Sequence, residues 1–193
     1  MPTRPSARDR LLDAAESVLF SSGIRATPVD ELLRQAEVSP ATMYAHFGSK
    51  DALVAQALRR RLADWQRVWD AHVLAAGDDT SRLLALFDAL AAYREDRTTR
   101  WCAFLATAAE HTAQEGEIAD AVAADTALLA ERLLHLAGPI AGATAQELAD
   151  EVLLVYNGTL ASFLRGAPAS AVVVGRRLAE SAVEAHRSAA ERS

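Results

Sequence analysis

The chain has 193 residues, of which 51% are hydrophobic and 24% charged, so it can bury a substantial core and is not a disordered polymer. No apolar run approaches the length of a membrane span, and the start MPTRPSAR lacks the apolar core of a signal peptide. The single cysteine, Cys102, cannot close an intramolecular disulfide, as in proteins of reducing compartments. We therefore expect a cytoplasmic protein without a membrane partner.

The net charge of −6 is unevenly distributed along the chain. Residues 1–62 carry nine Arg or Lys and seven Asp or Glu, a balance of +2, which leaves −8 for the remainder. An acidic body behind a mildly basic N-terminal segment is compatible with nucleic-acid binding by that segment.

Apolar residues recur at intervals of three and four almost everywhere, which predicts an all-α protein. The spacing predicts a first helix from about residue 7 to 21, ended by Gly23. A second helix is expected to start at Thr27-Pro28, with Thr27 as its N-cap and Pro28 in the first helical position.

A third helix is predicted to begin at Ser39-Pro40, so close to the second that the two form a helix-turn-helix. Met43 and Phe47 are four residues apart and are expected to face the core. An exposed Tyr44-x-His46 pair is unusual for packing on so short a helix, which favours a surface that contacts another molecule.

The rest of the chain is predicted to be helical as well. A fourth helix is expected to begin after Ser49 and to run for about seven turns, with one face apolar from Leu58 to Val73. Further helices are expected near residues 80–93, 100–111, 117–136, 145–165 and 168–187, with the GPIAGAT segment as a loop between two of them.

The stretch TPVDELLRQAEVSPATMYAHFGSKDAL resembles the DNA-binding domain of the tetracycline-repressor (TetR) family of bacterial transcription regulators. Glu37 departs from the pattern, because the family often has the turn glycine there. The resemblance implies a three-helix helix-turn-helix domain over residues 1–48 and a helical domain over 49–193 that binds an effector and forms the dimer.

The resemblance and the residue chemistry together indicate which side chains meet DNA. Helix N-termini with hydroxyl caps suit phosphate, and Tyr44, His46 and Lys50 are expected to bind the DNA backbone, while small side chains on the third helix face bases in the major groove. Packing and capping roles are the alternative for each residue taken singly. The predicted DNA-binding residues are Thr27, Ser39, Pro40, Ala41, Thr42, Tyr44, Ala45, His46 and Lys50.

Bulky aromatic residues among alanines suggest a mainly apolar effector pocket with a few polar groups. Ordinary core packing is the alternative for every one of them. The predicted pocket residues are Trp65, Trp69, Phe87, Trp101, Cys102, Phe104, Thr107, Tyr156 and Asn157. The histidines and acidic residues have no metal-ligand spacing, and neither a metal nor a cofactor is expected.

Two stripes near the C-terminus predict a homodimer of the kind that the resemblance implies. Packing of both stripes within one chain is the alternative, and the symmetry of operator recognition favours the dimer. The predicted interface residues are Leu153, Leu160, Leu164, Ala171, Val174, Leu178, Ala182 and Ala185.

Nothing in the sequence supports catalysis, since GPIAG lacks both the strand and the GK[ST] of a phosphate loop and no nucleophile–base grouping can be assembled. We therefore predict a regulator and not an enzyme. It is expected to be a repressor that a small, mainly apolar effector releases from a near-palindromic DNA operator. The alternative is a helical protein–protein adaptor that does not bind DNA.

Overall fold

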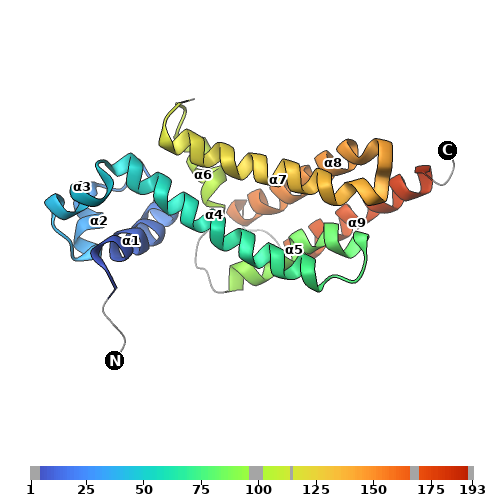
Figure 1. Ribbon diagram of the computed structural model, residues 1–193, viewed down its shortest axis with the longest axis horizontal. Coiled ribbons are helices and arrows are strands. Elements are labelled where there is room, and N and C mark those ends of the chain that lie inside the picture. Colours follow the sequence, from blue (N-terminus) through green and yellow to red (C-terminus); the bar gives the residue numbers. More distant parts are fainter. Residues whose placement is uncertain (1–4, 96–101, 114, 166–169, 191–193) are drawn as a thin grey trace. The chain divides into compact units, whose positions relative to one another are not determined.

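The computed structural model describes residues 5–95, 102–113, 115–165 and 170–190, and these residues form α-helices joined by short turns and two 3₁₀ turns (Figure 1). The chain divides into two compact units. Unit 1 comprises residues 1–63 and 102–125, and unit 2 comprises residues 64–101 and 126–193. Two helices, α4 and α7, contribute residues to both units. No helix in the described part of the chain is long and apolar enough to cross a membrane.

Unit 1 contains α1 (Ala7–Ser22), α2 (Val29–Ala36), α3 (Pro40–Phe47), the first half of α4 (Lys50–Ala75), α6 (Ala103–Glu110) and the start of α7 (Glu117–Ala141). Its core joins Leu11 of α1, Leu32 of α2 and Met43 of α3, all fully buried. Phe104 of α6 and Ile118 of α7 belong to the same core. The part of the chain predicted to read DNA therefore shares its core with two later helices.

Unit 2 contains the second half of α4, α5 (Asp79–Glu95), most of α7, α8 (Ala145–Ser162) and α9 (Ala171–Ala190). Helix α9 lies beside both α5 and α8 (Figure 1). Gly175 permits this packing, because a Cβ at that position would lie 2.2 Å from Thr159 Oγ1 and 3.1 Å from Phe87 Cε1. His186 Nδ1 of α9 lies 2.8 Å from Oγ1 of Thr144, the residue that precedes α8.

Two local predictions are wrong. Thr27 does not cap α2, because Pro28 occupies the N-cap position while the Thr27 hydroxyl donates to Gly23 O at 2.7 Å. The GPIAGAT segment is not a loop, since α7 continues through Pro139 to Ala141 and residues 142–144 form a 3₁₀ turn. A proline in a helix costs one backbone hydrogen bond locally, and this late position tolerates that cost.

Candidate DNA-binding surface and effector region

The helix-turn-helix has the short turn that the sequence predicts. Glu37 ends α2 in the left-handed conformation, with φ 52° and ψ 49°, and Val38 N–H donates to Leu33 O at 3.1 Å. Arg10 of α1 stabilises this turn, because its guanidinium donates to Ala36 O at 2.8 Å and Glu37 O at 3.2 Å. Sequence reasoning missed Arg10, since no local pattern shows that α1 reaches the end of α2.

Helix α3 begins as expected at a capped N-terminus. Ser39 Oγ accepts from Thr42 N–H at 3.2 Å and lies 2.9 Å from Thr42 Oγ1, and Pro40 occupies the first helical position. Ser39 and Pro40 are exposed, while Thr42 is half-buried.

The burial pattern of α3 agrees with the predicted division into two faces. Met43 is completely buried and Phe47 packs against the core, whereas Ala41, Ala45 and His46 are exposed. Tyr44 is an exposed large aromatic residue, with 53% of its surface accessible. A short helix that exposes aromatic, imidazole and small side chains together presents a surface suited to a groove.

Lys50 opens α4 as predicted and has an additional role within the chain. Its ammonium donates to Ile24 O at 2.6 Å and to Thr27 O at 2.7 Å, so it holds the turn between α1 and α2. An ammonium has three N–H donors, and these two bonds leave one for another acceptor. Thr27 itself is buried, with 3% of its surface exposed.

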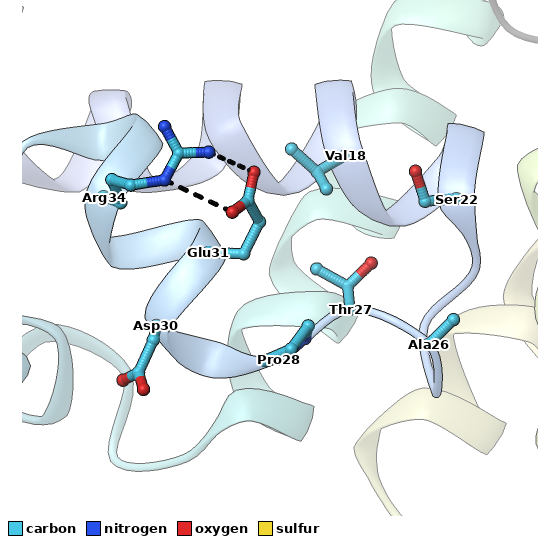
Figure 2. Close-up of a pocket in the computed structure, with 8 residues that line it drawn as sticks. All are labelled: Val18, Ser22, Ala26, Thr27, Pro28, Asp30, Glu31 and Arg34. Carbon is cyan, nitrogen blue, oxygen red and sulfur yellow. Dashed lines mark hydrogen bonds and ion pairs between the residues drawn. The ribbon is translucent and has the colours of Figure 1, made fainter.

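A hollow of about 530 Å³ lies between the end of α1 and α2 (Figure 2). Figure 2 shows Val18 and Ser22 of α1 along one side and the Glu31–Arg34 ion pair of α2 along another. The hydrogen bond from Arg34 holds the pKa of the Glu31 carboxyl below its usual value. The hollow is lined by Val18, Ser22, Ala26, Thr27, Pro28, Asp30, Glu31 and Arg34.

Unit 2 brings several of the predicted pocket residues together. The Trp65 ring lies 5.7 Å from Trp69 and 6.2 Å from Tyr156, and Phe87 lies 6.4 Å from Tyr156, between ring centroids. Asn157 follows Tyr156 on α8 and is half-buried. Tyr93, which sequence reasoning did not include, adds an edge-on contact to Trp65 at 5.4 Å.

We call these five residues, Trp65, Trp69, Phe87, Tyr93 and Tyr156, the aromatic cluster, and polar groups lie at its border. The guanidinium of Arg132 lies over the Trp69 ring at 4.2 Å and forms an ion pair with Asp70 at 2.5 Å. Trp69 Nε1 is buried and has no hydrogen-bond partner within the described residues. An indole N–H without an acceptor is uncommon in a protein interior, which marks this place as one where a ligand acceptor would be favourable.

Three of the remaining predicted pocket residues, Cys102, Phe104 and Thr107, belong to unit 1. The fourth, Trp101, lies outside the described residues. Phe104 is part of the unit 1 core, and Thr107 is fully buried with its hydroxyl donating to Ala103 O at 2.7 Å. Burial raises the pKa of the Cys102 thiol to about 11 and that of the Asp125 carboxyl to about 7. Membership of the effector pocket stays a prediction for Trp101, Cys102, Phe104 and Thr107.

The predicted dimer residues divide by exposure. Leu160 and Ala171 are buried within the chain, so neither offers a surface to a partner, while Leu153, Val174 and Ala182 are half-buried. Exposed apolar surface on α8 and α9 comes from Leu154, Val173, Leu178 and Ala185, and Leu164 of the following 3₁₀ turn adds to it. Leu154 and Val173 were not predicted, because the chosen stripes followed the apolar spacing that also builds the core.

Comparison with known proteins assigns the helix-turn-helix. Residues 11–57 match the family model described as bacterial regulatory proteins, tetR family. The helix-turn-helix segment of the chain is therefore of the TetR-family type. A TetR-family transcriptional regulator from Streptomyces coelicolor has the same fold, with a TM-score of 0.87 at 20% identity over 94% of this chain and 96% of that one.

Curated relatives match about half of the chain. The transcriptional repressor KstR2 of Mycolicibacterium smegmatis is 32% identical over 95 residues, 46% of each protein. The transcriptional regulator BetI of Rhizobium meliloti is 32% identical over 109 residues, 54% of this chain and 53% of that protein. The chain thus spans about half the length of these relatives. Both are named as regulators of transcription and neither as an enzyme, in agreement with the sequence prediction.

Proposed function

We propose that this TetR-family chain is a homodimeric, ligand-responsive repressor that binds a near-palindromic DNA operator and is released from it by a small, mainly apolar effector. The observation that carries the DNA-binding part is the exposed face of α3, with Tyr44, Ala45 and His46 accessible beside a helix start capped by Ser39. A protein of this kind acts in the cytoplasm, where the operator is.

The division of labour on α3 follows from side-chain chemistry. The Tyr44 hydroxyl and the His46 imidazole suit phosphate oxygens, which position the domain without selecting a sequence. Pro40, Ala41 and Ala45 are small and exposed, so they suit close contact with base edges such as thymine methyl groups. Tyr44→Phe is therefore expected to weaken binding to all duplexes alike, and Ala45→Gln to change which sequence is preferred.

The first experiment selects duplexes from a random library with the wild-type protein and measures their binding at several salt concentrations. We expect an enriched near-palindrome whose affinity falls steeply with salt, because bound phosphates release counterions. Failure to enrich any sequence, with salt-independent or absent duplex binding, would instead favour the protein–protein adaptor.

Lys50 is proposed to contact phosphate through the N–H that Ile24 O and Thr27 O leave available. Lys50→Ala should then lower the salt slope of binding by about one unit. Tyr44→Phe is the matched comparison, because it removes an uncharged group and should leave that slope unchanged. An unaltered slope for Lys50→Ala would limit this residue to holding the α1–α2 turn.

The effector is proposed to bind at the aromatic cluster of unit 2. Trp69 Nε1, which is buried and has no acceptor among the described residues, supports an effector that carries one hydrogen-bond acceptor on an apolar body. Binding there would move α4, which runs from unit 1 into unit 2. This movement would change the spacing between the two DNA-binding domains of the dimer. To change the ratio of the released to the DNA-binding conformation from 1:99 to 99:1, the effector must bind the released conformation more favourably by about 5.5 kcal/mol.

A further inference from the structure

The last residue of α6 reaches the turn between α1 and α2. Glu110 Oε2 accepts a hydrogen bond from the Arg25 backbone N–H at 3.0 Å, across 85 positions of sequence. Glu110 and Arg25 both belong to unit 1, so the contact lies within one compact body. It joins a helix of the second half of the sequence to the helices that are proposed to read DNA.

Gly23 makes room for this carboxylate. A Cβ at position 23 would lie 2.8 Å from Glu110 Oε1, closer than such atoms approach in real structures, and the glycine has φ +97°. The backbone conformation therefore favours glycine at this point of the turn. The Glu110 carboxylate lies directly against this glycine, so a side chain at position 23 would have to displace the carboxylate.

The same turn is held on other atoms by Lys50 of α4. Lys50 Nζ donates to Ile24 O and Thr27 O, while Glu110 accepts from Arg25 N–H between them. The Lys50 ammonium and the Glu110 carboxylate together hold three backbone groups of the segment that leads into α2. These groups are the carbonyls of Ile24 and Thr27 and the N–H of Arg25. Charge-assisted bonds of this kind are stronger than bonds between neutral groups.

We propose that Glu110 is a positioning residue for DNA recognition, which sets the start of α2 by holding the α1–α2 turn through the Arg25 N–H. Because α2 packs against α1 and leads directly into α3, a displaced turn changes how the reading helix is presented. Glu110 touches no DNA in this arrangement and acts through the turn. The inference rests on the proposed function, but the turn can be observed without DNA.

The experiment compares full-length Glu110→Gln, Glu110→Asp and Glu110→Ala with the wild-type protein. Gln keeps the length of the side chain and an acceptor oxygen but loses the charge, whereas Asp keeps the charge but is one methylene shorter. Glu115→Ala, at an exposed glutamate in the same unit, is the control. Hydrogen exchange of the Arg25 amide in the free protein is one readout, and affinity for the duplex selected by the wild-type protein is the other.

Glu110→Ala and Glu110→Asp should each speed exchange of the Arg25 amide and weaken duplex binding by about tenfold, the effect of losing one hydrogen bond to a charged group. Glu110→Gln should stay within about threefold of wild type in both readouts, and Glu115→Ala should match wild type. If Glu110→Ala does not fold, the Gln and Asp variants decide the question.

Wild-type exchange of the Arg25 amide or wild-type affinity for the duplex in Glu110→Asp would overturn the proposal. A wild-type protein that selects no duplex would refute the proposed function instead. The exchange readout at Arg25 would still report whether Glu110 holds the turn, so the two failures are distinguishable.

Discussion

Glu37 occupies a backbone conformation that favours glycine. Its φ of 52° places a side chain in the left-handed region, which costs a non-glycine residue about 1 kcal/mol. The turn is retained because Arg10 binds the carbonyls of Ala36 and Glu37 and the Val38 N–H is bonded to Leu33 O. Glu37 thus stands where the TetR family often has glycine, and Arg10 of α1 stabilises its strained backbone.

Glu37→Gly should therefore unfold at higher urea concentration than Glu37→Ala, with a difference of about 1 kcal/mol in the free energy of unfolding. The alanine variant is the reference because it also lacks the glutamate side chain and yet keeps the backbone strain. Equal stability of the two variants would show that the turn carries no such strain.

Asp125 makes the stability of unit 1 depend on pH. Burial raises the pKa of its carboxyl from 3.8 to about 7. Well below pH 3.8 the carboxyl is protonated in both the folded and the unfolded chain and contributes no difference to the free energy of unfolding. As the pH rises towards 7 the unfolded chain loses this proton while the folded chain keeps it, so the carboxyl increasingly favours the unfolded state.

Asp125→Asn cannot ionise, so it should be about as stable as wild type at pH 4 and more stable by about 1–3 kcal/mol at pH 8. Thermal unfolding at both pH values measures this difference. Asp120→Asn, at an exposed position of the same helix, should show no such change with pH. A gain for Asp125→Asn that is equal at both pH values would contradict the assignment.

At the scale of elements, periodicity and caps predicted the helices well. The Ser39-Pro40 start of α3 and the inward side of Met43 could be read from the sequence, because both depend on residues three or four apart. The exposed side of α3 followed from the same local rules. Glu110 could not be placed in this way, since its partner Arg25 lies 85 positions away and only tertiary packing brings the two together.

The pocket and the dimer face were harder to predict for a related reason. An apolar stripe shows that one side of a helix is covered but not what covers it, so the spacing cannot separate pocket residues from core residues such as Phe104, which lies in the unit 1 core. Leu160 was likewise assigned to the dimer and is buried within the chain. Tyr93 and Arg132 join the aromatic cluster from separate helices and have no shared sequence signal.

Close packing of α9 on α8 and α5 leads to a test with paired glycines. Gly175→Ala should destabilise the protein by about 1–3 kcal/mol, because the new Cβ meets Thr159 Oγ1 and Phe87 Cε1 and must displace them. Gly158→Ala, within α8, meets nothing within 4 Å and should stabilise by up to about 1 kcal/mol. Chemical unfolding of both variants checks the pair, and a Gly175→Ala protein as stable as Gly158→Ala would contradict the packing.

At the scale of the whole molecule, the proposed dimer can be tested at Leu178. This side chain is 52% exposed on α9, so Leu178→Arg should leave the folded chain intact while placing like charges near a two-fold axis. We expect folded monomers that bind the selected duplex weakly, because an interface of at least roughly 1,000 Å² is lost. Sedimentation and duplex binding measure the two effects.

Leu74→Arg is the matched control, since Leu74 is 88% exposed and lies at the end of α4 outside the proposed interface. It should sediment and bind as wild type does. Micromolar wild-type protein that sediments as a monomer with full duplex affinity would refute the two-fold arrangement.

The aromatic cluster of unit 2 has a spectroscopic consequence. Trp65 and Trp69 are two of the three tryptophans in the sequence, and unit 1 has no tryptophan in its sequence range. Their emission therefore reports on unit 2, and the Arg132 guanidinium over Trp69 makes that emission sensitive to small displacements of either group. Intrinsic fluorescence of the unlabelled protein can accordingly be used to screen compounds for binding at this cluster, while occupation of α3 by DNA is followed separately with a dye on the duplex.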